Sequence, residues 1–247
     1  MLLSRKFLND YVDISDINTQ DLADKMTNVG NEYDKIGSLL VGTNLVVGEV
    51  LECVNHPDSD HLHVCKVNVG DEILQIVCGA PNVCKGLKVI VAKVGAVLPE
   101  IEIKKSTIRG VESNGMLCSL RELGIDHKFL SQKDIDGICE LPNDAKIGDD
   151  PRKVLMMDDE YIDFELTSNR GDLLSILGMA YELGAIYDKK VKEVEMAHKE
   201  EGEDLNKEFS VDIKTENCKL FLARKAKNVT IKESPDFIKN RLIASRN

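Results

Sequence analysis

The densest group of side chains able to bind a metal ion lies between residues 56 and 65. On a strand, His61, His63 and Cys65 would alternate and share one face, and zinc accepts histidine and cysteine ligands. Structural zinc sites usually take their ligands in spaced pairs from two loops, and this segment has no second pair. The other interpretation is a polar loop around Asp58 that leads into a strand with a buried Cys65. We favour the loop and predict no metal site.

The sequence carries no recognisable catalytic motif. It contains no G-x-x-x-x-G-K-[ST] loop, no G-x-G-x-x-G after a strand and no G-x-S-x-G elbow. These are the usual signatures of nucleotide binding and acyl transfer. We therefore predict no catalytic residue in this chain.

Composition points to the cytoplasm. The apolar start Met1-Leu2-Leu3 runs at once into Ser4-Arg5-Lys6, too short for a signal peptide, and no window is apolar enough for a membrane span. The 7 cysteines form an odd set without a C-x-x-C pair, which is typical of thiols in a reducing compartment. We expect no membrane partner.

Basic residues are concentrated in one stretch of an acidic region. Residues 39–151 carry 11 basic and 17 acidic side chains, so a general nucleic-acid coat is excluded. Between residues 85 and 109, however, the only acids are Glu100 and Glu102. The basic candidates for contacts with the backbone of a structured RNA are Lys88, Lys93, Lys104, Lys105, Arg109 and Arg121. From charge alone, the alternative of solvated surface residues is favoured.

Hydrophobic periodicity indicates a helical start followed by a β-rich part. Leu22, Met26 and Val29 recur at helical spacing, and a short helix is plausible around residues 5–11. The segments predicted as strands are 44–54, 63–69, 72–78, 88–92 and 101–108, with a hairpin turn at Gly70-Asp71 and a short helix at 120–123. Strands this short and closely spaced predict a small closed or partly closed barrel. Its only aromatic residue is Phe129, beyond the strands, so recognition by base stacking is not expected.

The second half of the chain returns to helical and mixed patterns. A helix is predicted at 172–187, where an apolar stripe contains Leu173, Leu177, Ala180, Gly184 and Tyr187. Residues 193–208 are charged without a repeat and indicate a linker. Strands at 209–213 and 220–223 and a helix at 235–242 begin another unit, too small to bury a core. We expect the chain to be cut from a longer protein.

Four ordered blocks resemble the tRNA-binding OB domain of several aminoacyl-tRNA synthetases and their cofactors. They are Val47-Gly48-Glu49-Val50, His56-Pro57-Asp58-Ser59-Asp60, Val77-Cys78-Gly79-Ala80-Pro81-Asn82 and the segment from Ile108 to Ser119. Met1–Val12 and Asp163–Asp172, with Ser175 and Gly178, resemble the start of the bacterial phenylalanyl-tRNA synthetase β subunit. Gly171 stands where that pattern usually has proline, which affects only the helix entry. Ser234-Pro235 to Arg246 resemble the opening of its editing-type domain.

The resemblance implies an α+β multidomain fold. A tRNA-binding OB barrel at 39–151 would be inserted into a small helical/mixed domain formed by 1–38 and 152–195. An acidic linker at 196–208 and the truncated start of an editing-type α/β domain at 209–247 would follow. The flanking halves would pack together, with Leu22, Met26 and Val29 against the helix at 172–187.

The resemblance also implies partners and a reaction for the whole enzyme. That enzyme is a cytoplasmic α2β2 tetramer that joins phenylalanine to tRNA using ATP and Mg²⁺. Aminoacylation occurs in the α subunit, and editing occurs in a later β domain. This chain would therefore be non-catalytic and need no cofactor itself. Its expected partners are tRNA and the α subunit, with no DNA.

The blocks add polar residues to the candidate tRNA-binding set, namely Asn82, Ser113, Asn114 and Ser119. Turn chemistry accounts for about half of such asparagines and serines, so each is either loop architecture or an RNA contact. Two other functions stay open. One is a stand-alone OB-fold RNA-binding protein, and the other is a purely structural module, which the acidic balance of 39–151 favours.

Overall fold

The computed structural model describes residues 1–193, 201–232 and 234–244. It divides into two units: Met1–Lys192 together with helix α6 (Asp236–Ala244), and residues 193–235. Parts of the predicted linker and of the flanking segments, residues 194–200 and 245–247, lie outside the described residues. The limits of the three predicted domains and of the linker stay predictions.

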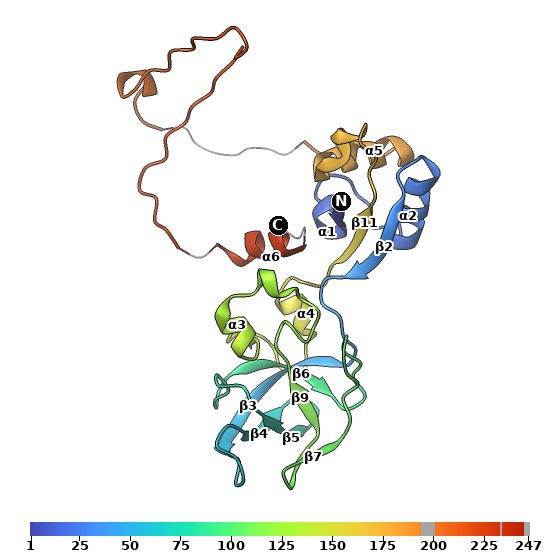
Figure 1. Cartoon of the computed structure of the whole chain (residues 1–247), viewed down its shortest axis with the longest axis vertical. Coiled ribbons are helices and arrows are strands. Elements are labelled where there is room, and N and C mark those ends of the chain that lie inside the picture. The colour runs from blue at the N-terminus through green and yellow to red at the C-terminus, as the bar shows by residue number, and fades with distance from the viewer. Residues whose placement is uncertain (194–200, 233, 245–247) are drawn as a thin grey trace. The chain divides into compact units, whose positions relative to one another are not determined.

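Within the first unit, the chain before the barrel and the chain after it share one antiparallel sheet (Figure 1). Strand β11 (Glu160–Phe164) lies between β1 (Leu2–Ser4) and β2 (Tyr33–Ser38). Two helices, α1 (Arg5–Asn9) and α2 (Thr19–Asn28), lie between β1 and β2 in the sequence. Helix α5 (Ile176–Tyr187) follows β11. One hydrophobic core therefore contains residues far apart in the chain, such as Leu3, Leu22, Phe164 and Leu183.

Helices α2 and α5 pack into this core with faces slightly different from those predicted. Leu22 and Met26 are buried as expected, but Val29 is 47% exposed because α2 ends at Asn28. Leu177, predicted on the buried stripe of α5, is 40% exposed. The predicted helix is broken at Ser175, whose Oγ accepts a hydrogen bond from the Gly178 amide and caps α5. The short 3₁₀ turn η2 (Gly171–Leu174) precedes it.

A nearly closed antiparallel barrel of the OB type forms the middle of the chain (Figure 1). Its strands are β3 (Leu45–Asn55), β4 (His63–Asn68), β5 (Ile73–Cys78), β6 (Lys88–Lys93), β9 (Gly115–Leu117) and β10 (Glu140–Leu141). They follow the order β10–β6–β3–β4–β5, and β9 also pairs with β6. The amide of Asn114 donates to the Gln75 carbonyl (2.8 Å), which brings the β9 segment against β5 and almost closes the barrel.

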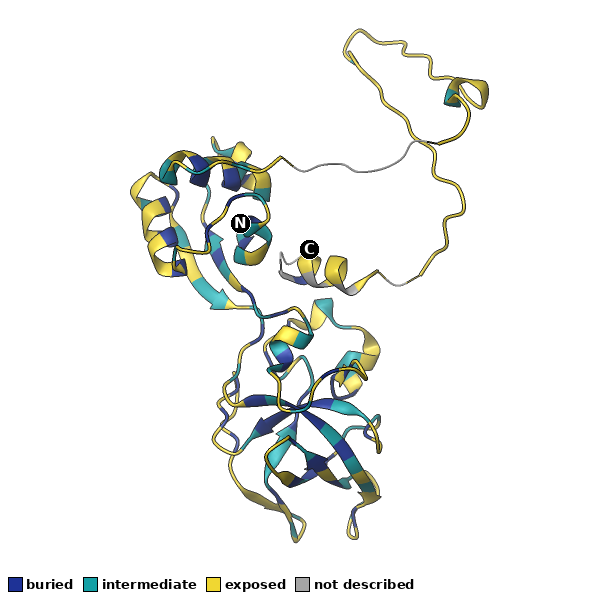
Figure 2. Ribbon diagram, turned by 180° about the vertical axis from the view of Figure 1, so that it is seen from behind, coloured by how far each residue is buried: buried dark blue, intermediate teal, exposed yellow. Residues whose placement is uncertain are grey.

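The barrel is tightly packed where β3 bends. Strand β3 pairs with β6 along its first half and with β4 along its second half, with a bulge between Val50 and Glu52. A Cβ on Gly48 would lie 2.5 Å from Val91 Cγ2 and 2.9 Å from Val67 Cγ1. Only glycine fits this crossing of three strands. Figure 2 shows how burial concentrates on these strands.

One prediction within this region was right only in part, and another was wrong. The strand predicted at 101–108 is reduced to β7 (Ser106–Ile108), and β7 forms a hairpin with β8 (Val111–Ser113). The predicted helix at 120–123 is only a turn. The remaining elements of this region are η1 (His127–Phe129), α3 (Gln132–Asp136) and α4 (Pro151–Val154). The predicted hairpin turn at Gly70 was right, with φ +103° at the glycine.

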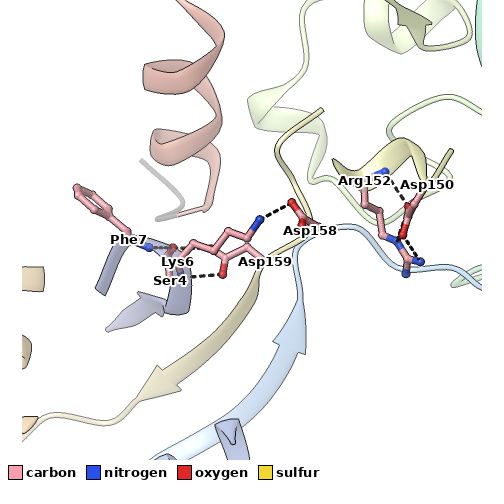
Figure 3. Close-up of polar contacts among 7 residues, drawn as sticks. All are labelled: Ser4, Lys6, Phe7, Asp150, Arg152, Asp158 and Asp159. Atoms are coloured by element: carbon pink, nitrogen blue, oxygen red, sulfur yellow. Dashed lines mark hydrogen bonds and ion pairs between the residues drawn. The ribbon is translucent and has the colours of Figure 1, made fainter. Parts of the chain in front are cut away.

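A polar cluster around the buried Ser4 and Asp159 connects the first residues to the segment after the barrel (Figure 3). Ser4 caps α1 by accepting from the Phe7 amide (3.1 Å), and its hydroxyl donates to Asp159. Asp159 also accepts from the Lys6 amide (2.9 Å), while the Lys6 ammonium pairs with Asp158. Burial raises the pKa of Asp159, although these hydrogen bonds oppose the rise.

The second unit contains little regular structure. Its one short turn of helix in the described residues is η3 (Leu205–Lys207), and most residues from 201 to 232 are exposed (Figure 2). The strands predicted at 209–213 and 220–223 were wrong, because no described neighbour pairs with them or buries their apolar side chains. The helix predicted at 235–242 corresponds to α6.

Candidate nucleic-acid interface

The β3–β4 loop and the β7–β8 hairpin are tied together by His56. This buried imidazole accepts a hydrogen bond at Nδ1 from the Asp58 amide (3.0 Å), and its Nε2 lies 3.1 Å from the Ile108 carbonyl oxygen. In an OB barrel, these are the loops after the first and fourth strands, which commonly contact oligonucleotides. The sequence block that begins at His56 and the block that begins at Ile108 therefore lie next to each other. In each of these hydrogen bonds, the partner of the histidine ring is a backbone group.

Arg109 stands at the tip of this hairpin, next to Gly110. Both residues have positive φ, +47° and +84°, as a tight two-residue turn requires. The Arg109 side chain is exposed, and its Nη1 donates to the Asp58 carbonyl oxygen (2.9 Å). Its charge therefore meets a neutral acceptor.

Lys104 and Lys105 precede the hairpin and are exposed. Lys104 Nζ lies 3.1 Å from a Glu102 carboxylate oxygen, and Lys105 Nζ lies 3.3 Å from one of Glu112. Their side chains remain 72% and 60% exposed. Such surface pairs contribute only about 0–1 kcal/mol, so a phosphate can replace the carboxylate at small cost.

Lys88 and Lys93, at the two ends of β6, are less accessible. Lys88 pairs with Glu49 across the strands at 3.2 Å, and Lys93 lies between Glu72 (2.7 Å) and Asp71 (3.1 Å). The carboxylates of Glu72 and Asp71 raise the pKa of Lys93. With side chains only 14% and 20% exposed, these lysines mainly join strands and turns.

The side-chain amide of Asn82 forms hydrogen bonds within the fold. Its Oδ1 accepts from the Ile138 amide (3.0 Å), and its Nδ2 donates to the Ile138 carbonyl (3.0 Å) and to Glu140 (2.9 Å). This last bond is the main reason that the pKa of Glu140 is lowered. A Cβ on Gly137 would lie 2.6 Å from the Asn82 amide oxygen, so the glycine leaves room for this side chain.

Ser113 and Ser119 are also used within the fold. Buried Ser113 accepts from the Val77 amide (3.0 Å) and donates to the Gly115 carbonyl (3.2 Å). Ser119 and Glu122 close the turn after β9 reciprocally, with the Ser119 amide 2.7 Å from the Glu122 carboxylate. Neither hydroxyl is directed to a ligand by these contacts.

Asn114 and Arg121 complete the candidate set. Asn114 is half-buried and lines a small surface depression with Ile73, Leu74 and Lys93. Arg121 is exposed, and its guanidinium has no hydrogen bond or ion pair with the residues that the structure describes. Only Arg109 and Arg121 among the basic candidates thus lack a carboxylate partner in the described chain.

The metal hypothesis gains no support from the geometry. Within residues 1–193, 201–232 and 234–244, no three histidine, cysteine or acidic side chains are arranged to hold an ion. His61 lies in the β3–β4 loop instead of alternating along β4 with His63 and Cys65. Burial raises the pKa of Cys65, and that of Cys118 to about 12, so these thiols stay protonated.

One residue that joins the two loops of this surface was not singled out by the sequence. His56 was part of a quoted block, but its two partners are the backbone groups of Asp58 and Ile108. Its position beside a proline at the end of a strand was the available signal.

Among the helices that the structure describes, none is long and apolar enough to cross a membrane.

Residues 45–150, which comprise the barrel and its loops, match the protein family described as "Putative tRNA binding domain". The match thus covers the barrel and its loops and leaves the flanking segments outside it.

Over nearly its whole length, the chain is homologous to bacterial phenylalanine–tRNA ligase β subunits, which confirms the predicted resemblance. It is 45% identical over 249 residues to the β subunit of Bacillus cereus, covering 99% of this chain and 31% of that protein. It is 46% identical over 245 residues to that of Streptococcus pneumoniae, covering 98% and 30%. The chain thus spans about a third of the length of these curated relatives.

A partial likeness to a solved structure adds nothing to the fold assignment. A MetRS related protein from Pyrococcus horikoshii is 22% identical and matches 42% of this chain and 84% of its own, with a TM-score of 0.30.

Proposed function

We propose that this chain is part of the β subunit of a phenylalanine–tRNA ligase, to which it contributes tRNA binding and subunit architecture. The observation that carries the proposal is the 45% identity over 99% of the chain, together with the tRNA-binding domain match at residues 45–150. The whole enzyme would charge tRNA with phenylalanine. The aminoacylation and editing sites would lie in other parts of it, so this chain by itself would be non-catalytic.

The proposed domain arrangement is a tRNA-binding OB domain at 39–151 inserted between two halves of a helical/mixed domain, 1–38 and 152–195. Support comes from strand β11, which pairs with β1 and β2 across the inserted barrel. An acidic linker at 196–208 and the start of an editing-type domain at 209–247 complete the arrangement.

The partners of the whole enzyme follow from the same proposal. They are tRNA and an α subunit, in a cytoplasmic α2β2 tetramer that uses ATP and Mg²⁺. This chain would bind neither cofactor itself. The relatives named as β subunits support the existence of a second subunit type.

On the barrel, the tRNA-binding surface would centre on the β7–β8 hairpin. Lys104, Lys105 and Arg109 are exposed there, and the loops of an OB barrel are its usual contact regions for nucleic acid. Without aromatic side chains on the strands, recognition would rest on phosphate and shape. Arg121 is a further exposed cation of the same domain.

The experiment is a titration of labelled tRNA with the chain, followed by fluorescence anisotropy at several salt concentrations. Single-stranded DNA of similar charge is the control. We expect tRNA-selective binding, with a logarithmic affinity that falls against the logarithm of salt at a slope of roughly −2 to −4 for about three to five phosphates. No selectivity for tRNA at low salt would reject the proposal for this chain.

A second candidate function is purely structural. It is favoured by the pairing of Lys88, Lys93, Lys104 and Lys105 with carboxylates, which leaves little unopposed positive charge. In that case the barrel would only pack against other parts of the enzyme. The same titration separates the two functions, because a structural module would show no tRNA-selective signal.

A further inference from the structure

Among the residues that the structure describes, two side chains make the hydrogen bonds between the β3–β4 loop and the β7–β8 hairpin. His56 links the Asp58 amide to the Ile108 carbonyl, and Arg109 donates back to the Asp58 carbonyl. We call these three hydrogen bonds the loop clasp. Each has a backbone group as one partner, so substitutions at His56 and Arg109 test the whole clasp without changing any other side chain.

The hydrogen bonds fix the tautomer of His56. Its Nδ1 accepts from a backbone N–H, so this nitrogen carries no proton. The proton of the neutral ring is therefore on Nε2, which donates to the Ile108 carbonyl oxygen. The residue is 3% exposed, and both ring nitrogens have a hydrogen-bond partner in the clasp. The histidine thus holds the hairpin at a fixed position relative to the loop.

Arg109 occupies a backbone conformation that an arginine adopts at a cost. Its φ of +47° lies in the left-handed region, which glycine, asparagine and aspartate tolerate better. The turn itself therefore does not explain an arginine there, and strained residues often serve a function. Arg109 is exposed, and its guanidinium makes no second hydrogen bond or ion pair with the described residues.

The clasp orients the Arg109 charge without neutralising it. The Asp58 carbonyl takes one of five guanidinium donors, whereas the neighbouring Lys104 and Lys105 face carboxylates. A guanidinium that is held by one neutral acceptor keeps donors for a bidentate bond to phosphate. Orienting it before binding reduces the ordering cost on association.

We propose that His56 is a positioning residue for RNA binding: through the clasp it presents Arg109 to a phosphate of the bound tRNA. This inference rests on the proposed tRNA-binding function and adds the residue that prepares the surface. His56 itself does not contact the RNA in this account, since its ring is buried and fully hydrogen-bonded.

The test is a double-mutant cycle with His56→Ala, Arg109→Ala and the double variant, measured by tRNA anisotropy. Arg109→Ala is expected to weaken binding roughly threefold to tenfold and to reduce the salt slope by about 1. His56→Ala is expected to weaken wild-type binding by a similar factor but to have no further effect in the Arg109→Ala background. Equal effects of His56→Ala in both backgrounds, or none in either, would overturn the proposal.

His56→Asn guards against a simple loss of folding. Asparagine keeps an acceptor for the Asp58 amide in a local turn but is too short to reach Ile108. It should leave the barrel folded, weaken tRNA binding like His56→Ala, and increase hydrogen exchange of residues 106–113 while exchange in β4 and β5 stays unchanged. Unchanged exchange at 106–113 would also contradict the positioning role.

The possible outcomes distinguish failure of the positioning role of His56 from failure of the proposed tRNA-binding function. If the wild-type chain shows no tRNA-selective binding, the proposed function fails and the role of His56 in RNA binding fails with it. If the wild-type chain binds tRNA but the cycle is additive, only the role of His56 is overturned.

Discussion

The Nε2 atom of His56 lies 3.1 Å from the carbonyl oxygen of Ile108, 52 residues further along the chain. This bond connects two loops at one end of the barrel and places the exposed Arg109 beside them. The tRNA-binding surface that we propose is thus formed by loops held together by a buried side chain, with exposed cations around them.

Asn82 should matter for stability and not for tRNA affinity. Asn82→Ala removes three hydrogen bonds to Ile138 and Glu140 and leaves the Ile138 amide without its partner. The expected loss is about 1–3 kcal/mol in the free energy of unfolding, measured with urea. tRNA affinity at a temperature where the variant is folded should match that of the wild type. A large loss of affinity in a fully folded variant would show that Asn82 contacts RNA.

Gly48→Ala should destabilise the barrel. The added Cβ would meet the branched side chains of Val91 and Val67 at 2.5 and 2.9 Å, and neither can move away freely. We expect a loss of about 1–3 kcal/mol from overpacking, seen as a lower melting temperature. Gly171→Ala is the matched control, because a Cβ there meets nothing within 4 Å. Equal stability of the two variants would contradict the packing described for β3.

Asp159 should make the chain less stable as the pH rises. Its pKa is raised on folding by burial, so the folded state holds its proton to a higher pH than the unfolded state. The stability gained at low pH is therefore lost as the pH passes through the raised pKa. Urea unfolding of the wild type and Asp159→Asn between about pH 4 and about pH 7 checks this. The wild type should lose stability relative to the variant with rising pH; the opposite trend would refute it.

The contribution of Glu182 to stability should change with pH in the opposite direction, and be lost as the pH falls. Arg170 contacts Glu182 at 2.8 Å and lowers the pKa of this carboxyl group, so folding favours its ionised form. The contribution is present at neutral pH and disappears as the pH falls through the lowered pKa. Arg170→Met should cost about 1–2 kcal/mol at neutral pH.

The Arg170 prediction is checked by unfolding both proteins over a pH series. The difference in unfolding free energy between wild type and Arg170→Met should shrink in acid, because Glu182 and Asp172, the two carboxylates that pair with Arg170, then become neutral in both. A difference that is independent of pH would mean that Arg170 acts through packing and not through its charge.

Local patterns were sufficient to predict much of the barrel. The alternation on either side of Gly70 identified β4 and β5, because period and turn chemistry agree there. The strand prediction for residues 101–108 was right only at its end, because apolar side chains in this segment are buried without forming a strand. Ile103, for example, is buried but lies outside any strand. Likewise Phe209 and Phe221 have strand-like neighbours but no described partner that buries them.

The candidate site was less predictable because its chemistry depends on distant partners. Lys93 is a plausible RNA contact in sequence, yet the β4–β5 turn brings Asp71 and Glu72 to it. His56 binds backbone groups, which no side-chain pattern reveals. Contact between the ten candidate residues and tRNA stays a prediction.

The most direct measurement compares tRNA binding by two charge-reversed variants. One carries Lys104→Glu, Lys105→Glu and Arg109→Glu; the control carries the same charge change at Lys25, Lys35 and Lys146, which are exposed elsewhere. Our account predicts at least about a tenfold loss of affinity and a flatter salt dependence for the first variant, with a much smaller effect in the control. Equal affinities of the two variants would contradict a tRNA-binding surface at the β7–β8 hairpin.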